Sequence, residues 1–500
     1  MSNLSELLPT GGGQNAVDFV ASGTLSSGQT VVLKTDGTVG AVAETVVSES
    51  GGTPAAAASG NRTYNSLFVY HEALGQLIYI YLDGNRYPSA SVCTLNGTTI
   101  TFGTPVITNS NTAQALDALY MPNTESIVIA FRLTSFFQGY VQAGTATSST
   151  TSWGGINGQG TNSLNPVLAY HATTGHVITY YEEDSNYDDS YLGRCKGYSV
   201  TGTTMTLQST SNILWGGQQA YGSIQAYGIC YDSNINRIVV SGIVPVPPFF
   251  FTKVPKWNIV SYTGSFSVGA YGDAVTSSTS AGRTGIHYDS TSQSVVYNYL
   301  LDANPTAFNV AAGTLSTTSL TLGSYTSLGT TYSASSLVSV ITHDANSGKN
   351  IAIFCGGSSP YPIYFRSFTT SGTSITLGNT VTVTSSTGGP PNRSSITAIP
   401  NFQLAISYEN TTNDRRDYSI GQLSYTLTNN TDFIGITAEA ISDTATGAVN
   451  VYGGINEAQT GLTIGSDYYV QDDGSLSTTA SSVKVGQAIS ATTINMMDLT

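Results

Sequence analysis

The histidines and the scattered carboxylates are the side chains that could support acid–base chemistry in this sequence. His71 and His171 each follow a tyrosine at the end of an apolar stretch, a position that Asp232 and Asp289 fill elsewhere. Histidine and aspartate both tolerate turn geometry, so we interpret these four residues as turn residues, whereas His343 fills the tyrosine position just before the turn. The sequence contains no Ser-His-Asp order, GxSxG or HExxH pattern. We therefore expect no catalytic residue and no enzymatic activity.

One dense acidic stretch, YYEEDSNYDDSYLGR (180–194), is the best candidate for a metal site. Asp184, Asn186 and Asp188 have the spacing of a calcium-binding loop. However, Asp189 stands where such a loop needs glycine, and no glutamate follows at the bidentate position. We interpret the stretch as a solvated hairpin tip and expect no metal. Carboxylates here or around Asp302 could suit glycoside hydrolysis, although sialidase-type Asp boxes are missing.

The cysteines lie far apart, at Cys93, Cys195, Cys230 and Cys355. No pair forms a CxxC motif, so the pattern supports neither a zinc knuckle nor a redox centre. We expect four buried free thiols and no cofactor.

Composition excludes several classes of protein. Charged residues make up 9 % of the chain and the net charge is −14, so the clustered cations that nucleic acids require are absent. The basic pairs Lys253/Lys256 and Arg415/Arg416 are interpreted as solvated loop charges. The N-terminal residues lack the pattern of a secretory signal. The most apolar run, GIVPVPPFFF (242–251), is about half the length of a membrane span. We expect no membrane partner and synthesis in a cytoplasm.

A repeat of about 50 to 60 residues fills the centre of the chain. Its most regular element is an apolar strand, seen in LIYIYLD (77–83), HVITYYE (176–182) and NIAIFCG (350–356), with seven copies in all. A shorter strand and a turn precede each copy, and a turn with two further strands follows. In the first copy the last turn is Asn96-Gly97, which favours a type I′ hairpin. Four short strands repeated seven times predict an all-β fold, a seven-bladed β-propeller over residues 61–432. A β-solenoid is the competing fold.

The loops between the second and third strands differ from the other turns. They vary in length and are rich in aromatic residues, whereas the turns between the first two strands are short and polar. Aromatic side chains can stack on sugars or anchor protein interfaces. The alternative is that they only seal one blade against the next. The candidate contact residues are Tyr87, Phe136, Phe137, Tyr187, Tyr191, Phe249, Phe250, Trp257, Tyr361 and Tyr418.

The two ends of the chain resemble each other. LSSGQTVVLKTDGTV (25–39) and LTIGSDYYVQDDGSL (462–476) share a leucine, a glycine, a strand core and an Asp-Gly turn at matching offsets. We expect small β modules at residues 1–60 and 433–500 that dock onto another surface or onto each other. Coincidence between two hairpins is the alternative.

These end segments also carry a family resemblance. TGLTIGSDYYVQDDGSLSTT with VKVGQAISATTINM, and NAVDFVASGTLSSGQTVVLKTDGTV, resemble the terminal modules of bacteriophage virion proteins, especially tail fibres and appendages. The phrase TTITFGTPV resembles propeller-like repeats in such proteins. The long insertion VPVPPFFFTKVPKWN in the fourth copy and the weak seventh copy depart from the pattern.

The resemblance implies a structural component of a phage particle, assembled in the host cytoplasm and located in the virion. We expect partners among other virion proteins, a homo-oligomer, and binding of a host surface glycan or a neighbouring subunit through the propeller loops. A capsid decoration or neck protein without receptor binding and a glycan-cleaving propeller enzyme are the alternatives.

Overall fold

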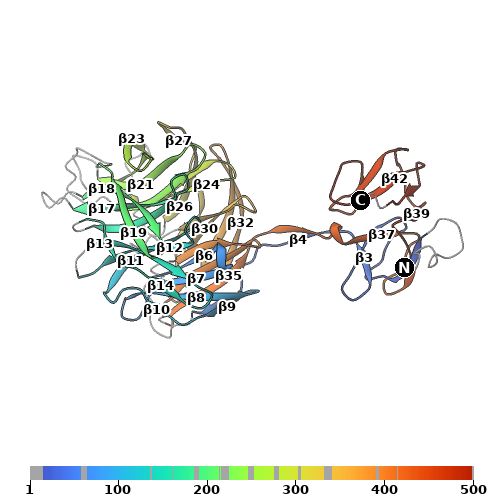
Figure 1. Ribbon diagram of the computed structural model, residues 1–500, viewed down its shortest axis with the longest axis horizontal. Coiled ribbons are helices and arrows are strands. Elements are labelled where there is room, and N and C mark those ends of the chain that lie inside the picture. Colours follow the sequence, from blue (N-terminus) through green and yellow to red (C-terminus); the bar gives the residue numbers. More distant parts are fainter. Residues whose placement is uncertain are drawn as a thin grey trace. The chain divides into compact units, whose positions relative to one another are not determined.

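The computed structural model describes residues 15–57, 65–135, 138–160, 163–184, 191–212, 214, 225–245, 253–274, 281–301, 306–331, 340–389, 394–413 and 415–497. It divides the chain into two compact units. Unit 1 combines both ends, residues 1–48 and 424–500, and unit 2 contains residues 49–423. Figure 1 labels many of the strands in both units. Within the described residues, no helical segment has the length and apolar character that a bilayer crossing requires.

The described part of unit 2 forms seven antiparallel sheets of four or five strands, numbered here as blades 1 to 7. Blades 1 to 3 contain the following strands: β6 Ser66–His71, β7 Gln76–Leu82, β8 Pro88–Asn96, β9 Thr99–Phe102 and β10 Val106–Ile107; β11 Ala113–Met121, β12 Ser126–Leu133, β13 Gln138–Ala146, β14 Thr151–Trp153 and β15 Asn157–Gly158; β16 Leu164–His171, β17 His176–Asp184, β18 Tyr191–Thr201 and β19 Thr204–Thr210.

The remaining blades repeat this meander. Blades 4 to 7 contain the following strands: β20 Gln225–Asp232, β21 Arg237–Pro245, β22 Lys253–Tyr262 and β23 Phe266–Asp273; β24 Ala281–Asp289, β25 Ser294–Leu301, β26 Thr306–Leu315, β27 Leu320–Leu322 and β28 Thr326–Thr331; β29 Val340–Asp344, β30 Lys349–Cys355, β31 Ile363–Ser371 and β32 Ser374–Thr384; β33 Ser394–Ile399, β34 Gln403–Asn410, β35 Arg415–Gln422 and β5 Ala55–Ala56.

The first strands of the blades form a closed ring. Each contacts the first strand of the next blade, from β6 through β11, β16, β20, β24 and β29 to β33, and β33 contacts β6 again. Blade 7 takes its fourth strand from the other end of unit 2, because Ala55 and Ala56 pair with Tyr418 and Asp417 of β35. Closing the ring in this way protects sheet edges and buries both faces of each blade. The all-β class and the propeller architecture predicted from the sequence are confirmed.

Local sequence explains the blades. The second strands are apolar on both faces, as in β30, where six of the seven residues are buried, because each blade packs between two others. In blades 1, 3 and 6 the turn between the third and fourth strands places glycine at the first central position, with φ of 59° at Gly97, 56° at Gly202 and 57° at Gly372. Asn96 pairs with Thr99, so the central residues are Gly97 and Thr98, and only Gly97 has positive φ. This geometry matches a type II′ turn, not the predicted type I′ turn.

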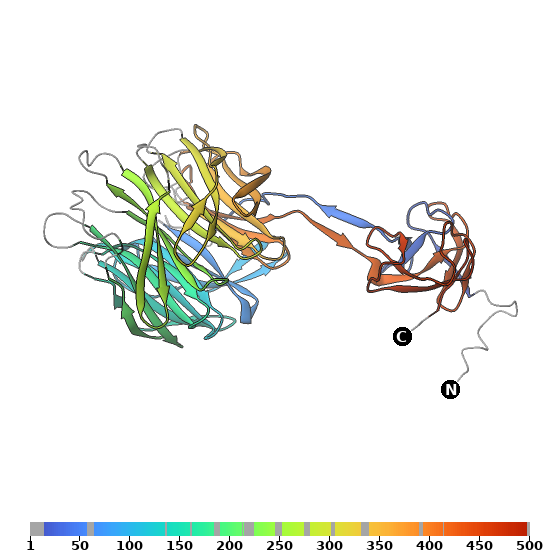
Figure 2. The same cartoon turned by 90° about the horizontal axis from the view of Figure 1, so that it is seen from above.

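Unit 1 contains two five-stranded sheets. Module 1 comprises β1 Ala16–Val20, β2 Thr30–Leu33, β3 Val39–Ala41, β37 Phe433–Thr437 and β38 Thr446–Val451. Module 2 comprises β39 Ile455–Asn456, β40 Asp467–Val470, β41 Leu476–Ser477, β42 Lys484–Ala488 and β43 Ile494–Asn495. A separate ribbon pairs β4 Glu44–Val47 with β36 Tyr425–Thr428, drawn in blue and orange in Figure 2.

The two modules have the same topology. Their strand orders are β1-β38-β37-β2-β3 and β39-β43-β42-β40-β41, which correspond strand for strand. The register shift between Val31 and Val32 in module 1 recurs between Tyr468 and Tyr469 in module 2. The Asp-Gly turns also match, because Gly37 and Gly474 have φ of 83° and 82°. Residues 42–432, which include the whole propeller, are therefore an insertion between the third and fourth strands of module 1.

The observed division differs from the predicted boundaries at residues 60 and 432. The structure assigns 49–57 to unit 2, where β5 completes blade 7, and 424–432 to unit 1. The two ends of the chain are parts of one unit, because β1 pairs with β38 and β2 with β37.

Candidate functional site

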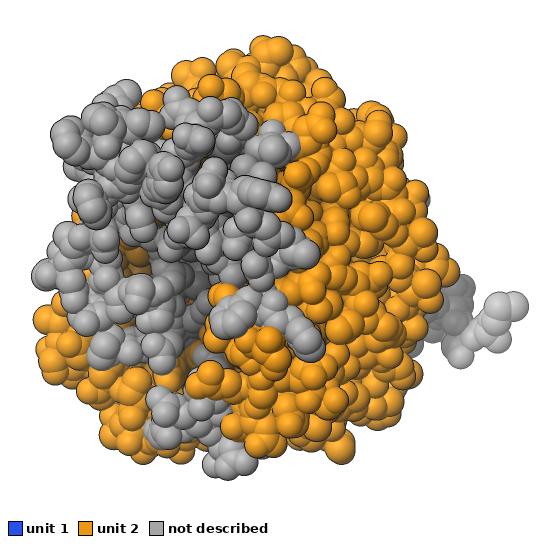
Figure 3. All heavy atoms as spheres, turned by 90° about the vertical axis from the view of Figure 1, so that its left-hand side faces the viewer, with its two compact units in different colours: residues 1–48, 424–500 blue, residues 49–423 orange. Residues whose placement is uncertain are grey.

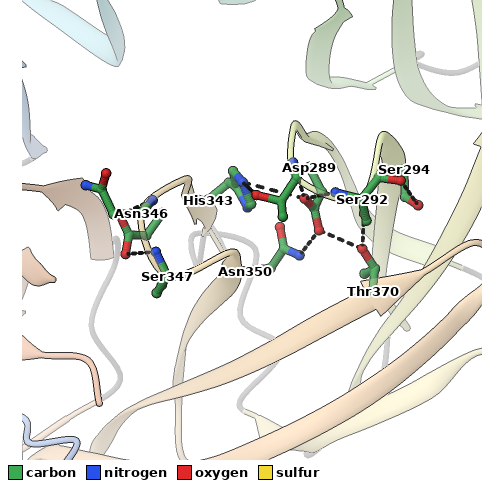
Figure 4. Close-up of polar contacts among 10 residues, drawn as sticks. Asp289, Ser292, Ser294, His343, Asn346, Ser347, Asn350 and Thr370 are labelled. Carbon is green, nitrogen blue, oxygen red and sulfur yellow. Dashed lines mark hydrogen bonds and ion pairs between the residues drawn. The ribbon is translucent and has the colours of Figure 1, made fainter. Parts of the chain in front are cut away.

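The turns between the first and second strands of the blades hold a cluster of polar and titratable side chains. It lies between blades 5 and 6, around Asp289 at the end of β24 (Figure 4). His343, Asn350 and Thr370, from β29, β30 and β31 of blade 6, converge on its carboxylate. A carboxylate beside an imidazole could serve as an acid–base pair, so its geometry decides whether this is a reactive site.

The Asp289 carboxylate is saturated with hydrogen bonds. Its Oδ1 accepts from the backbone N–H groups of Thr291 and Ser292, each at 3.0 Å. Its Oδ2 accepts from Asn350 Nδ2 at 2.7 Å and from Thr370 Oγ1 at 2.6 Å. The side chain is 1 % exposed, and His343 Nε2 lies 3.5 Å from Oδ1. All of these donors belong to the protein, so the oxygens are already occupied.

Electrostatics agree with this geometry. Burial opposes ionisation of Asp289, but hydrogen bonds from Thr370, Ser292 and Asn350, with the charge of His343, hold its pKa below the ordinary value. Burial lowers the pKa of the neighbouring His287 to about 4, and the charge of His343 adds to this effect. A buried carboxylate with a lowered pKa is a poor general base, because it binds protons weakly and meets no solvent.

The same position holds an equivalent contact in other blades. Asp232 Oδ1 accepts from Asn234 N at 2.9 Å, and the Tyr288 hydroxyl from blade 5 reaches the Asp232 carboxylate. In blades 3 and 4 the ring of His171 lies 4.3 Å from that of Tyr231. The turn residues His71, His171, Asp232 and Asp289 are thus covered by Tyr120, Tyr231, Tyr288 and His343 of the following blades. The prediction that these side chains are turn residues is correct, and their shared role is to clamp adjacent blades.

A second set of contacts repeats along the same seams. The residue that begins a second strand donates to the carbonyl group of the glycine in the next blade's last turn. Ser126 Oγ donates to Gly202 O at 3.1 Å, and Ser294 Oγ donates to Gly372 O at 3.1 Å. Gln403 Nε2 of blade 7 donates to Gly97 O of blade 1 at 3.2 Å, across the point where the ring closes. The polar residues of this face therefore hold blades together.

The predicted aromatic contact residues separate into three groups. Tyr87 and Tyr361 are half-buried in the loops that precede the third strands of blades 1 and 6. Trp257 and Tyr418 are buried, at 7 % and 4 % exposure, inside the packing between blades. For these two the sealing alternative is correct. Residues Phe136, Phe137, Tyr187, Phe249 and Phe250 lie outside the described residues, as does the side chain of Tyr191, which begins β18.

Figure 3 shows one face of unit 2, where the grey atoms belong to residues that are not described. Of the residues considered for metal binding or hydrolysis, Asn186, Asp188, Asp189 and Asp302 are outside the described set. In the part of the chain that is described, no group of three or more His, Cys, Asp or Glu side chains could hold a metal ion.

Three further residue groups were also predicted. The cysteines are free and buried, as predicted, and burial raises the pKa of Cys93 and Cys355 to about 12. Arg416 is not a solvated loop charge, because it is 1 % exposed within β35, where it pairs in register with Glu409 of β34. Lys256 forms an ion pair with Asp273 at 2.6 Å.

Sequence reasoning missed an apolar surface on unit 1. Val17, Val20 and Leu33 of module 1 are 45 %, 41 % and 46 % exposed. No local sequence signal could have found it, because the exposure of these residues is seen only when the two modules are compared in three dimensions.

No protein-family model and no curated protein sequence matches the chain. Solved structures that resemble it include an α-L-arabinanase of Penicillium chrysogenum complexed with arabinobiose, covering 62 % of this chain and 92 % of that one. A Dyadobacter fermentans protein of unknown function covers 76 % and 99 %, and a protein from Lactobacillus plantarum covers 75 % and 98 %. Each has a TM-score of 0.42 and 10 % identity, values too low to indicate a shared function.

Proposed function

We propose that this protein is a non-enzymatic structural component of a bacteriophage virion, in the manner of a tail fibre or appendage. Unit 1 attaches the protein to neighbouring virion subunits. Unit 2 presents the loops between its second and third strands to a host surface glycan or to a neighbouring subunit.

The observation that carries this proposal is the chain topology of the two units. The propeller is inserted between β3 and β37 of module 1, so both of its ends return to the same small unit. Such an insertion lets a large domain be displayed without interrupting the module that holds it, because insertions are tolerated where the chain leaves and re-enters a domain at neighbouring points. Here β4 and β36, the outgoing and returning segments, pair directly with each other.

Two other features support the same role. Only 9 % of residues are charged, which weakens the repulsion between copies of a protein that assembles. The carboxylate and imidazole groups of the described turns are engaged in clamps between blades, as at Asp289 and His343. A scaffold of this kind presents its variable loops from a rigid ring.

The test is to locate the protein on intact particles with a gold-labelled antibody and to ask whether the purified full chain blocks adsorption of particles to host cells. Labelling of a tail or appendage and competition in the micromolar range are expected. Tyr87→Ala or Tyr361→Ala should weaken competition about tenfold, as for the loss of an aromatic anchor. Tyr271→Ala is the matched control, because Tyr271 is 65 % exposed on the last strand of blade 4.

Other outcomes would contradict the proposal in identifiable ways. Labelling of the capsid or neck without competition would assign the protein a purely architectural role. Release of reducing sugar ends from host polysaccharide, lost in Asp184→Ala or Asp302→Ala, would show a glycan-cleaving enzyme. Absence from the particle would exclude a virion role altogether.

A further inference from the structure

Modules 1 and 2 of unit 1 pack against each other, and their contact shows how one module of this fold covers a face of another. The outer face of module 1, formed by Val32, Val42, Phe433 and Ile436, packs against module 2 in one hydrophobic cluster. Module 2 contributes its own inner face, which includes Tyr468, Val470, Val485 and Ile494. Both modules belong to the compact unit on the right of Figure 2. The contact is therefore head to tail, the outer face of one module against the inner face of the next.

Polar contacts fix the margins of this interface. Asn456 Nδ2 of module 2 donates to Thr437 O of module 1 at 3.0 Å, and Gln459 Nε2 donates to Gly28 O at 3.0 Å. The Asp-Gly turn of module 2 also reaches module 1, because Thr30 Oγ1 donates to Gly474 O at 2.6 Å. Val470, at 0 % exposure, is covered completely.

Module 1 has the equivalent surface, and it is open among the described residues. The strand registers match Val17 with Asn456, Leu33 with Val470, and Gly37 with Gly474, and Val20 and Gln459 each follow three positions after the matched pair Val17 and Asn456. Val17, Val20 and Leu33 are 41 to 46 % exposed. A Cβ built on Gly37 would meet no described atom within 4 Å, whereas one on Gly474 would meet Val42 O at 2.4 Å. We call Val17, Val20, Leu33 and the Asp36-Gly37 turn the docking surface.

The opposite end of the pair is closed to a further module. The residues of module 2 that match Phe433 and Ile436 of the outer face are Lys484 and Gln487. Lys484 Nζ forms an ion pair with Asp467 at 2.7 Å, and Asp467 matches Thr30. A charged, hydrated face disfavours burial against valine and leucine. A head-to-tail contact between two copies of this chain through these faces would also extend without closing, as heterologous contacts do.

We propose that the docking surface binds the apolar outer face of a further module of the same five-stranded fold, carried by a different polypeptide. Module 1 then lies in the middle of a stack, with module 2 as its polar end. The docking surface is more apolar than the matching surface of module 2, because Val17 and Val20 stand where module 2 has Asn456 and Gln459. Those two polar side chains bind carbonyl groups of module 1. The partner of the docking surface should therefore offer apolar side chains at these places instead. This further module is the kind of partner to which unit 1 attaches, and the inference rests on the attachment role proposed above.

The experiment rebuilds the apolar outer face of module 1 on module 2 of the full chain. Asp467→Thr, Lys484→Phe and Gln487→Ile together place the residues of module 1 at the matching positions of module 2. At micromolar concentrations in sedimentation velocity, this triple variant should have at least about twice the weight-average mass of the unaltered chain, because each copy now carries both halves of the contact. Adding Leu33→Lys should return the mass to that of the unaltered chain.

Val46→Lys is the matched control, because Val46 is 67 % exposed but lies on β4, outside the docking surface. In the triple variant it should leave the association unchanged. Circular dichroism of the full chain, with hydrogen-exchange protection of β37 and β42, establishes that unit 1 of each variant is folded. Hydrogen exchange should show slower exchange of residues 33–38 in the associated form.

Three results would overturn the proposal. The folded triple variant could keep the mass of the unaltered chain, or it could associate equally with Leu33→Lys in place, which would indicate nonspecific apolar contact. Association that requires prior deletion of residues 1–14 would show that the chain covers this surface itself. These outcomes differ from failure of the proposed function, which is decided by whether the protein is found on particles.

Discussion

Asp232 and Asp289 occupy the same turn position in consecutive blades, yet the structure shifts their pKa values in opposite directions. Burial raises the pKa of Asp232, and hydrogen bonds from Asn234, Ile235 and Tyr288 only partly offset it. Asp289 is as deeply buried, but its pKa is lowered. Burial therefore does not decide the direction of these two pKa shifts. The hydrogen-bond donors that the next blade supplies decide it.

The difference can be traced to two side chains. Asn350 and Thr370 of blade 6 donate to Asp289. The strand registers place Val295 and Leu315 at the matching positions of blade 5, next to Asp232. The same backbone turn thus holds a carboxylate with many protein hydrogen-bond donors in blade 5 and a carboxylate with fewer donors in blade 4. The following predictions test this comparison, from the largest expected effect to the smallest.

Asp289→Ala should destabilise the propeller by about 3 to 5 kcal/mol, because it leaves two side-chain donors and two backbone N–H groups buried without their acceptor. Asp232→Ala should cost only about 1 kcal/mol. Urea unfolding followed by tryptophan fluorescence measures both, since all three tryptophans of the sequence lie within 49–423. Equal losses for the two variants would remove the distinction between the blades.

Asn350→Val with Thr370→Leu should make the Asp289 site resemble that of Asp232. The double variant should lose about 2 to 3 kcal/mol at pH 7, because the ionised carboxylate loses two charge-assisted hydrogen bonds. The free energy of unfolding lost through these two substitutions should be smaller when Asp289 is also replaced by asparagine. A double-mutant cycle measures this coupling, and additive free energies would contradict the assignment.

The two aspartates should also respond oppositely to pH. The folded pKa of Asp289 is depressed, so its contribution to stability is present above the unfolded pKa and is lost as pH falls through the folded value. The folded pKa of Asp232 is raised, so its contribution is present below the unfolded pKa and is lost as pH rises through the folded value. At pH 7, Asp289→Asn should destabilise the propeller and Asp232→Asn should stabilise it, each by about 1 kcal/mol. Unfolding curves at pH 3 and pH 7 with the same sign for both variants would refute this.

His287 should contribute the smallest effect. Its pKa of about 4 lies below the ordinary 6.5, so the unfolded chain binds a proton that the folded chain rejects between these values. Stability should therefore fall as pH drops from 6.5 to 4, by on the order of 1 kcal/mol, because the residue as a whole is half-buried. His287→Gln should remove this component of the acid sensitivity. The midpoint of thermal unfolding, measured every half pH unit, is the readout.

Much of the fold could be predicted because its signals are local. Alternating and continuous apolar runs such as QLIYIYL in β7 indicate strands, and Gly97, Gly202 and Gly372 mark the turns between them. The period of these signals indicates the propeller. Turn residues such as His171 and Asp289 were identified as turn residues for the same reason, since Asx and His side chains bond to backbone groups close in sequence.

The candidate site was less predictable. Tyr87 and Trp257 stand in similar aromatic-rich segments, but one is half-buried in a loop and the other is packed between blades. Nothing in the local sequence distinguishes them, because burial depends on which blade lies alongside. The hydrogen bonds to Asp289 come from residues 61 and 81 positions away, and no local pattern indicates such contacts.

The sequence by itself determined the strands, the turns, the repeat and the similarity of the two ends, because side-chain alternation and backbone φ preferences act over a few residues. Only the tertiary structure decided that β5 completes blade 7, that β1 joins β38 in one module, and that the propeller is inserted in that module. These pairings join segments hundreds of residues apart, and their free energy comes from closing a ring and burying sheet faces together. The exposure of Val17, Val20 and Leu33 follows from those pairings, which is why the docking surface emerges only when the two modules are compared in three dimensions.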